Sequence, residues 1–210
     1  MTVIGPRRLA LATVPRAAAA PASAGLPAAF RRALADLRDA RPRPEVRLRE
    51  IPAPEGQAPH AVALAADVCG GPGAGDEVLA TGRFVLLHDP SPAARWPGGF
   101  RAVTWIRASL EPDVALDHLA GAVAWTWLVE ALERRHAEHT GAGGTATRSI
   151  AEGFGTLGAA PDATDIELRA SWTPAPRDLG AHLEAWSDMI CAFAGLPPEH
   201  ADDAPAATGP

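Results

Sequence analysis

The sequence contains no lysine and no tyrosine, and it has only two cysteines in 210 residues. The absence of lysine excludes chemistry that needs an amine side chain, such as a phosphate-loop lysine, a Schiff base or a pyridoxal-phosphate anchor. Two cysteines cannot form the disulfide framework of a secreted miniprotein, so a reduced cytoplasm is the expected compartment. No apolar run approaches the length of about 18 residues that a membrane-spanning helix needs.

The overall composition is typical of one soluble domain. Hydrophobic residues make up 47% of the chain and charged residues 21%, and the formal net charge is −6. This negative charge argues against nucleic acid, a polyanion, as the main partner. All 19 residues counted as lysine or arginine are arginines, a bias typical of a GC-rich bacterial genome.

The two ends of the chain differ from its middle. Alanine and proline dominate the first residues, and such a segment buries too little apolar area to offset its ordering entropy. A signal peptide is not expected, because Pro15 and Arg16 end the apolar run that follows Arg7 and Arg8 too early. Residues 1–24 are therefore expected to be disordered or to precede the true start. The tail 198–210 has a similar composition, which leaves 25–197 as the domain.

Hydrophobic periodicity predicts three helices separated by strands. The expected helices cover 26–40, about 113–132 and 178–194, with Gly195 as the final C-cap. The expected strands cover 45–51, 60–69, 78–89, 100–110, 145–154 and 165–172. Gly82 is interpreted as a bulge, and Gly121 as a break in the second helix.

This order, α-β-β-β-β-α-β-β-α, predicts a two-layer α+β domain with an antiparallel sheet of about six strands and three helices. Four successive strands with short connections indicate a meander. The topology is similar to the secretion-chaperone-like fold, with one additional strand. That similarity concerns topology and implies no function.

Several segments carry a resemblance to a known family. They are RPRPEVRLREIPAP, ATGRFVLLHDP, FRAVTWIRASLEP, IELRASWTP and DLGAHLEAWSDMICAFAGLPP. Together they resemble an actinobacterial family labelled as a domain of unknown function, number 3000, over residues 26–198. The resemblance implies a cytoplasmic domain that excludes residues 1–24. It implies no activity and gives no residue a catalytic role.

Three residues are candidates for acid–base catalysis. Asp178 and His182 are four residues apart and share one face of the predicted last helix. His88 ends the most apolar strand, beside His60 at the start of the neighbouring strand. The competing interpretation makes Asp178 a simple N-cap. No serine or cysteine lies in a nucleophile motif, and Cys191 is expected in the core.

Glu133, His136 and His139 are the candidates for a metal site at the end of the second helix. A metal needs at least three converging ligands, and a di-metal bundle needs the Glu-x-x-His pattern on two helices. The pattern occurs once in this chain. The alternative is that His136 is solvated positive charge near a helix C-terminus, where it is favourable. No metal and no cofactor is therefore expected.

Two motifs could bind an anion. The glycines of 141–144 are typical of a phosphate loop, but they follow a helix and precede a strand, the reverse of that motif, so a helix cap and turn is expected. Arg41, Arg43, Arg47 and Arg49 could form a basic strip that receives RNA. Acidic neighbours interrupt the strip, which favours a solvated edge strand protected by charge.

Two tryptophans indicate a contact surface. Trp125 and Trp127 are two positions apart in the sequence, so they cannot both face inward on a helix. One of them is expected to be exposed or to lie at an interface with a protein partner or a second copy of the chain.

Three functional hypotheses follow, and the sequence leaves open whether the protein is an enzyme. The leading one is a cytoplasmic, non-enzymatic adaptor or chaperone-like module that binds a protein through its sheet face or second helix. The alternative is an enzyme or small-ligand binder with a pocket between sheet and helices, using His182, Asp178 and His88. The third is a weak RNA binder that uses the strip from Arg41 to Arg49.

Overall fold

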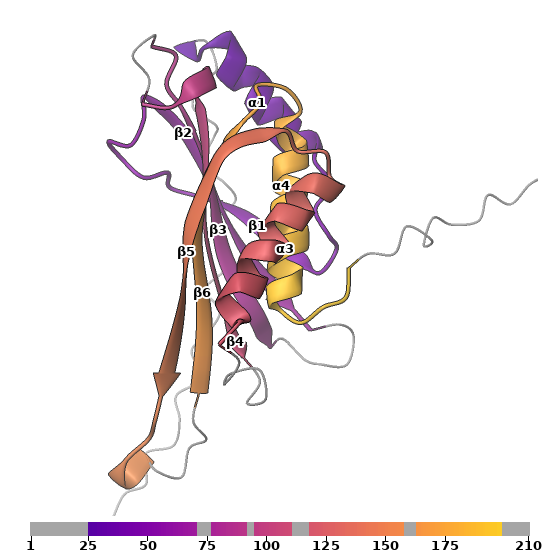
Figure 1. Cartoon of the computed structure of the whole chain (residues 1–210). Coiled ribbons are helices and arrows are strands. Elements are labelled where there is room, and N and C mark those ends of the chain that lie inside the picture. The colour runs from indigo at the N-terminus through magenta and orange to yellow at the C-terminus, as the bar shows by residue number, and fades with distance from the viewer. Residues whose placement is uncertain (1–24, 71–76, 92–94, 111–117, 158–162, 199–210) are drawn as a thin grey trace, which may run out of the picture.

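The computed structural model describes residues 25–70, 77–91, 95–110, 118–157 and 163–198. Within them lie three α-helices and a six-stranded sheet (Figure 1). The helices are α1 (Ala28–Asp39), α3 (Ala120–Arg134) and α4 (Leu179–Phe193). The strands are β1 (Val46–Ile51), β2 (His60–Cys69), β3 (Val78–His88), β4 (Phe100–Leu110), β5 (His139–Ala151) and β6 (Ala163–Pro174). Two short 3-10 turns are η2 (Pro97–Gly99) and η3 (Gly155–Leu157).

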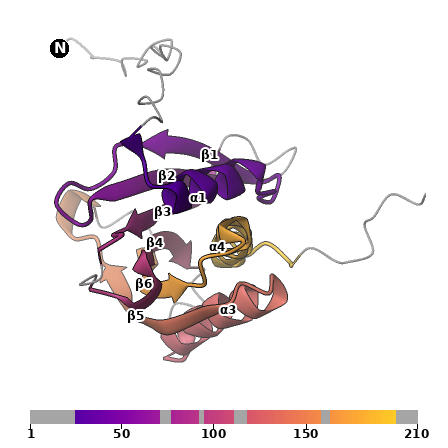
Figure 2. The ribbon, with the colours of Figure 1, turned by 90° about the horizontal axis from the view of Figure 1, so that it is seen from above.

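The α+β class and the order of helices and strands are confirmed. The sheet order is β1-β2-β3-β4-β6-β5, and every neighbouring pair is antiparallel. The predicted meander is therefore the first four strands. β6 then inserts beside β4 and leaves β5 as the outer strand. β1 and β5 form the two opposite edges of the sheet (Figure 2).

All three helices cover the same face of the sheet, with α4 between α1 and α3 (Figure 2). Most of α4 is buried, which explains why apolar residues surround it rather than forming one stripe. Its Trp186 is fully buried and donates a hydrogen bond of 2.6 Å to Thr104 on β4. A buried indole N–H that lacked such a partner would destabilise the fold. Cys191 is also fully buried, as predicted.

Gly82 is not a bulge, because its register with β2 and β4 is regular. A Cβ atom at this position would lie 2.8 Å from Ile190 and 2.9 Å from Trp186. Glycine is required there because α4 packs directly against the backbone of β3. The bulge of the β2–β3 pair lies between Val68 and Cys69 instead.

The prediction of a helix cap and turn at 141–144 is wrong. The second helix ends at Arg134, with Arg135 as its cap, and β5 begins at His139. Gly141 has a positive φ of 59° and lies in a bulge between Thr140 and Gly143. The bulge accommodates an extra residue that a one-to-one strand pairing cannot hold. The early residues of the predicted second helix, 113–117, the predicted tail 1–24 and all of the predicted tail 198–210 except Pro198 lie outside the described residues.

Candidate functional site

Asp178 and His182 have structural roles. Asp178 adopts a left-handed backbone and accepts a hydrogen bond of 3.3 Å from the Ala181 amide, so the N-cap interpretation is confirmed. His182 is 1% exposed, and its Nδ1 accepts a hydrogen bond of 3.1 Å from Trp172. Burial, together with the smaller effect of the nearby His139, lowers the pKa of His182 to about 4. A neutral, enclosed imidazole of this kind orients a tryptophan inside the core.

The described ring contacts of His88 do not include His182, whose ring contacts Trp172. Its ring stacks on Phe100 at 4.3 Å and on Phe30 at 5.8 Å, and the ring of His60 lies 6.0 Å away. The predicted proximity of His60 and His88 is correct, since they are register partners. Nδ1 of His88 donates to the Gly99 carbonyl at 2.9 Å, because that oxygen can only accept. Burial lowers the pKa of His88, which favours the neutral imidazole among the aromatic rings.

The proposed metal ligands lie around the turn between α3 and β5. His136 has a positive φ of 50°, and Nδ1 of His139 lies 2.9 Å from the Ala137 carbonyl. Glu133 is exposed on the last turn of α3. Among the residues that the structure describes, no three His, Cys, Asp or Glu side chains gather where they could hold a metal ion.

The two neighbouring tryptophans of α3 are both half-buried and both pack against the core. Neither tryptophan is fully exposed, and the alternative that one of them lies at an interface stays a prediction. They flank the buried stripe of Ala124 and Leu128 from opposite sides, which a separation of about 200° around the helix allows. Trp127 contacts Phe193 on α4 edge-on at 5.4 Å. Trp125 and Gly121 share a helix face, and Gly121 faces Ala146 on β5.

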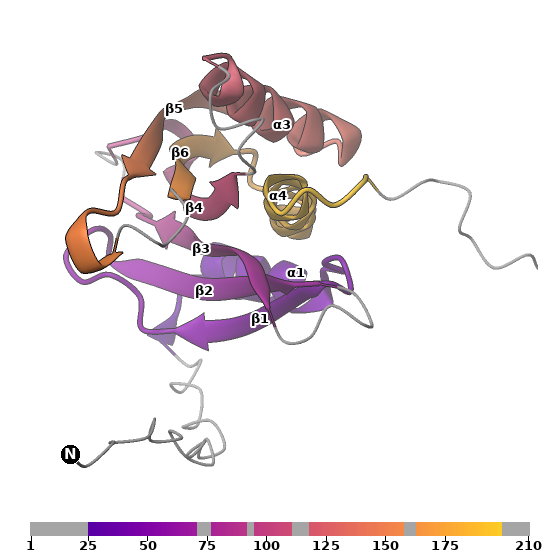
Figure 3. The same cartoon turned by 90° about the horizontal axis from the view of Figure 1, so that it is seen from below.

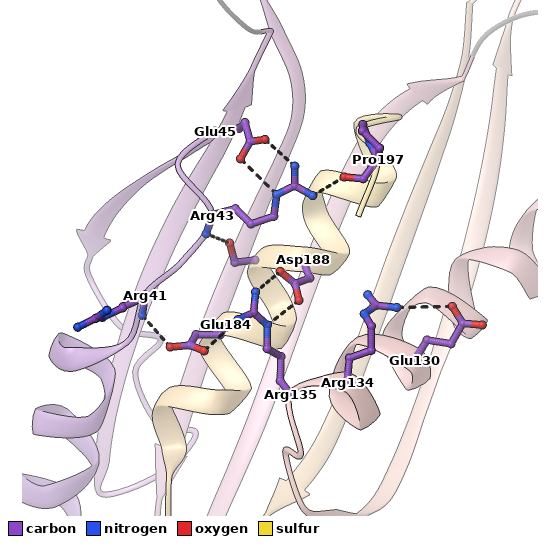
Figure 4. Close-up of polar contacts among 10 residues, drawn as sticks. Arg41, Arg43, Glu45, Glu130, Arg134, Arg135, Glu184, Asp188 and Pro197 are labelled. Carbon is purple, nitrogen blue, oxygen red and sulfur yellow. Dashed lines mark hydrogen bonds and ion pairs between the residues drawn. The ribbon is translucent and has the colours of Figure 1, made fainter. Parts of the chain in front are cut away.

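The arginine strip is divided by the fold. β1 is an edge strand, as predicted, but Arg43 precedes it and is only 5% exposed. The Arg43 guanidinium binds Glu45 and donates a hydrogen bond of 2.6 Å to the Pro197 carbonyl (Figure 4). The Arg41 amide donates to Glu184 on α4 at 2.8 Å. Arg41 and Arg43 thus attach the segment before β1 to the helices, and a continuous basic strip does not form.

A cavity of about 700 Å³ lies beside these contacts, between the C-terminal parts of α3 and α4. Arg43, Arg134 and Arg135 line it together with Glu130 and Asp188. Each arginine contacts a carboxylate: Arg43 binds Glu45, Arg134 binds Glu130 and Arg135 binds Asp188 (Figure 4). The positive charges in the wall are therefore neutralised by the protein itself, so the cavity offers little attraction for an anion. His182, Asp178 and His88 are not among its lining residues.

The opposite face of the sheet is not covered by any described helix (Figure 3). Register pairing places one straight row of side chains across all six strands on this open face. From one edge to the other, the row consists of Arg49, Ala65, Arg83, Trp105, Arg169 and Thr145. We call it the basic row. A depression of about 460 Å³ lies along its second half, lined by Arg83, Trp105 and Arg169.

The Trp105 side chain is held in place at the centre of the basic row. The Arg83 guanidinium lies 5.9 Å from the centroid of the indole ring, a cation–π distance. Hydrogen bonds from Arg169 and Trp105 keep the pKa of Glu167 below its ordinary value. The indole is therefore only partly exposed and has a defined orientation.

A second row runs beside the basic row, displaced from it by two residues on each strand. It contains Ile51, Ala63, Val85 and Val103, and we call it the apolar row. Counted over the whole open face, arginines outnumber acidic residues. The arginines are Arg47, Arg49, Arg83, Arg101, Arg107 and Arg169, and the acidic residues are Asp67, Asp165 and Glu167. The open face is thus basic in a chain whose formal net charge is −6.

The comparison with family models supports the resemblance noted in the sequence. A model described as "Protein of unknown function (DUF3000)" matches residues 26–202, most of the chain. The chain belongs to this family. Neither the curated proteins nor the solved structures contain a significant match. The likeness to the secretion-chaperone-like fold therefore remains an analogy of topology.

The matched region of this DUF3000 chain contains every described helix and strand, including the open face and its two rows. Sequence reasoning expected a sheet face in contact with a partner but did not identify Arg83, Trp105 and Arg169 as neighbours. The only local signal was alternation within each strand, which predicts a side chain's face but not its neighbours on other strands. None of the described helices has the length and apolar character needed to cross a membrane.

Proposed function

We propose that the protein is a non-enzymatic, protein-binding module whose open sheet face binds an acidic amphipathic helix of a partner. The observation that carries this proposal is the basic row lying beside the apolar row. A helix laid across the strands would place carboxylates on Arg49, Arg83 and Arg169. Its apolar stripe would cover Val85 and Val103.

The spacing of the arginines favours a helix with acidic residues every seven positions. Arg49, Arg83 and Arg169 lie on β1, β3 and β6, so each is two strands from the next, a spacing of about 9.5 Å. Seven residues of an α-helix rise about 10.5 Å, close to that spacing. Acidic residues at positions i, i+7 and i+14 therefore match the row.

The intramolecular ion pairs on this face leave the arginines able to exchange partners. Arg49 binds Asp67 at 2.9 Å and Arg169 binds Glu167 at 2.6 Å, while more than half of each arginine side chain is exposed. Exposed ion pairs contribute only about 0–1 kcal/mol, so a partner's carboxylate can replace them at little cost. The charge on the row also increases the rate at which an acidic partner associates.

We also propose that the protein has an actinobacterial origin and a cytoplasmic location. An actinobacterial origin is supported by the resemblance and by the use of arginine in place of lysine. A cytoplasmic location is supported by the low number of cysteines, Cys69 and Cys191, whose side chains are both buried. Fractionation of cells that express the tagged chain would test the location directly.

The test uses fluorescence anisotropy with a labelled synthetic helix of about 21 residues that carries Glu every seventh position beside a leucine stripe. We expect wild-type protein to bind it and to bind a scrambled peptide of equal composition at least tenfold more weakly. Arg83→Glu and Trp105→Ser should weaken binding by about tenfold or more. The matched control is Arg32→Glu, the same change on exposed α1, which should bind like wild type.

Two further results complete the test. A peptide with Lys at the central acidic position should bind Arg83→Glu better than wild type, because the charge pair is restored in reverse. Equal affinity for the ordered and scrambled peptides would overturn the proposal. Binding of oligouridine in place of both peptides, with loss in Arg83→Glu, would overturn it in favour of RNA recognition.

A further inference from the structure

The two edges of the sheet differ in how they are protected. β1 is short, carries Arg47, Arg49 and Glu50, and lies between Pro44 and Pro52. Charges and prolines at an edge prevent other strands from pairing with it. β5 is 13 residues long, contains no proline, and every residue from Gly143 to Ala151 is exposed. No described strand pairs with its outer side.

We propose that β5 pairs with β5 of a second copy of this chain, antiparallel and with Thr147 opposite Thr147. The regular part of the strand is Gly143–Ala151, which pairs one-to-one with β6, and Thr147 is its centre. This register places Thr145 opposite Ser149 on the open face. Every hydroxyl of Gly143–Ala151 on that face therefore meets a hydroxyl, a favourable cross-strand pair.

Charge is compatible with this register. Arg148 is the only Arg, Asp or Glu in β5. Pairing about Thr147 places Arg148 opposite Ala146, so the two arginines are diagonal neighbours and not directly opposed. The strand is thus complementary to itself, as a two-fold interface requires.

The same register buries an exposed apolar residue. Ile150 lies on the helix side of β5 and is 60% exposed. In the pair it lies opposite Gly144 of the second copy, which has no side chain to obstruct it. α3 and β5 run in opposite directions, and Gly121 is level with Ala146. Trp125, one helical turn later, is therefore level with Gly144.

Ile150 of one copy would thus pack between Gly144 and Trp125 of the other. This contact assigns the half-buried Trp125 to an interface between copies. The paired sheet would have a continuous open face, so a dimer would present two basic rows side by side. This surface shares only Thr145 with the basic row and none of its arginines, so the dimer can form whether or not that row binds a helix.

The experiment is light scattering after size exclusion of the full chain over a range of concentrations. We expect a dimer for wild type and a monomer for Thr147→Lys, because the substitution places two like charges directly opposite each other. Thr147→Glu alone should be a monomer for the same reason. An equimolar mixture of the two variants should recover the dimer, since the charges then form a pair across the two-fold axis.

Ile150→Ser should also weaken the dimer, by about tenfold or more in its dissociation constant. Its matched control is Val78→Ser, which changes a similarly exposed apolar residue far from β5 and should leave the dimer intact. Unchanged thermal unfolding of the Thr147 variants at low concentration confirms that they fold. A wild type that remains monomeric at all concentrations, or a Thr147→Lys and Thr147→Glu mixture that stays monomeric, would overturn the proposal.

Discussion

At the scale of single residues, the buried polar side chains serve the core. His182 accepts a hydrogen bond from Trp172, and Thr104 accepts one from Trp186, so the indole N–H groups of these two tryptophans are satisfied. These bonds join β4 and β6 to α4. Because the neutral imidazole is the form that accepts from Trp172, protonation of His182 would break this contact.

Stability should therefore fall in mild acid. The unfolded chain takes up a proton on His182 near its ordinary pKa of 6.5, but the folded protein does so only near a pKa of about 4. The contribution of His182 is fully present above pH 6.5 and is lost as the pH falls toward 4, to a limit of about 3 kcal/mol. His182→Gln keeps a neutral acceptor, so its free energy of unfolding should depend less steeply on pH in this window.

Urea denaturation at several pH values measures the effect. The exposed His118→Gln variant is the control and should keep the wild-type slope. The burial of His88 lowers its pKa too, so part of the slope should persist in His182→Gln. Identical slopes for wild type and His182→Gln would contradict the role assigned to His182.

At the scale of secondary-structure elements, the ion pairs of Arg135 join the end of α3 to α4. The Arg135 guanidinium donates two hydrogen bonds to Asp188, of 2.7 and 2.8 Å, and lies 3.4 Å from Glu184. Arg134, its neighbour in the chain, reaches Glu130 within α3 at 3.8 Å, and both side chains are about half exposed. Adjacent arginines therefore differ in function because one connects two helices and the other only covers a helix surface.

Replacing these arginines should have unequal effects on stability. Arg135→Ala removes a two-point, partly buried pair and should lower the free energy of unfolding by about 1–3 kcal/mol. Arg134→Ala should change it by less than about 0.5 kcal/mol. Guanidinium denaturation followed by tryptophan fluorescence gives both values under the same conditions. An Arg135→Ala change as small as that of Arg134→Ala would show that the pair contributes nothing to helix packing.

At the scale of the whole molecule, one face of the sheet is closed by helices and the other is open. The closed side contains the core, including Cys191 at 0% exposure, while Cys69 at the end of β2 is 8% exposed. A thiol in such an environment reacts only when the structure opens. The two cysteines therefore report on the integrity of the entire fold.

We expect a thiol reagent such as Ellman's reagent to label native protein at a rate limited by unfolding and to label two thiols per chain in denaturant. Val78→Cys adds a thiol at a position that is 52% exposed and should react at once. Immediate reaction of the native wild-type cysteines would contradict the packing of β2 and α4 described above.

Local patterns predicted the architecture correctly where one physical cause dominated. Alternation in 165–172 identified the buried side of β6, since Ile166, Leu168 and Trp172 are all at most 2% exposed. Asp178 was recognisable as an N-cap because its side chain bonds to a nearby amide of its own helix. The glycines at 141–144 led to the wrong prediction of a helix cap and turn. The bulge in which they lie depends on pairing with β6, a later segment of the chain.

The sequence by itself determined the class of fold and the order of its elements. Because it lacks lysine, it also excluded the chemistry that needs an amine side chain. Those properties follow from periodicity and composition, which are local. Only the tertiary structure decided which side chains meet across strands. It gave His88 and His182 different ring partners, buried Arg43, and aligned Arg83, Trp105 and Arg169. Register and strand order bring these residues together over long stretches of chain, and no local pattern encodes them.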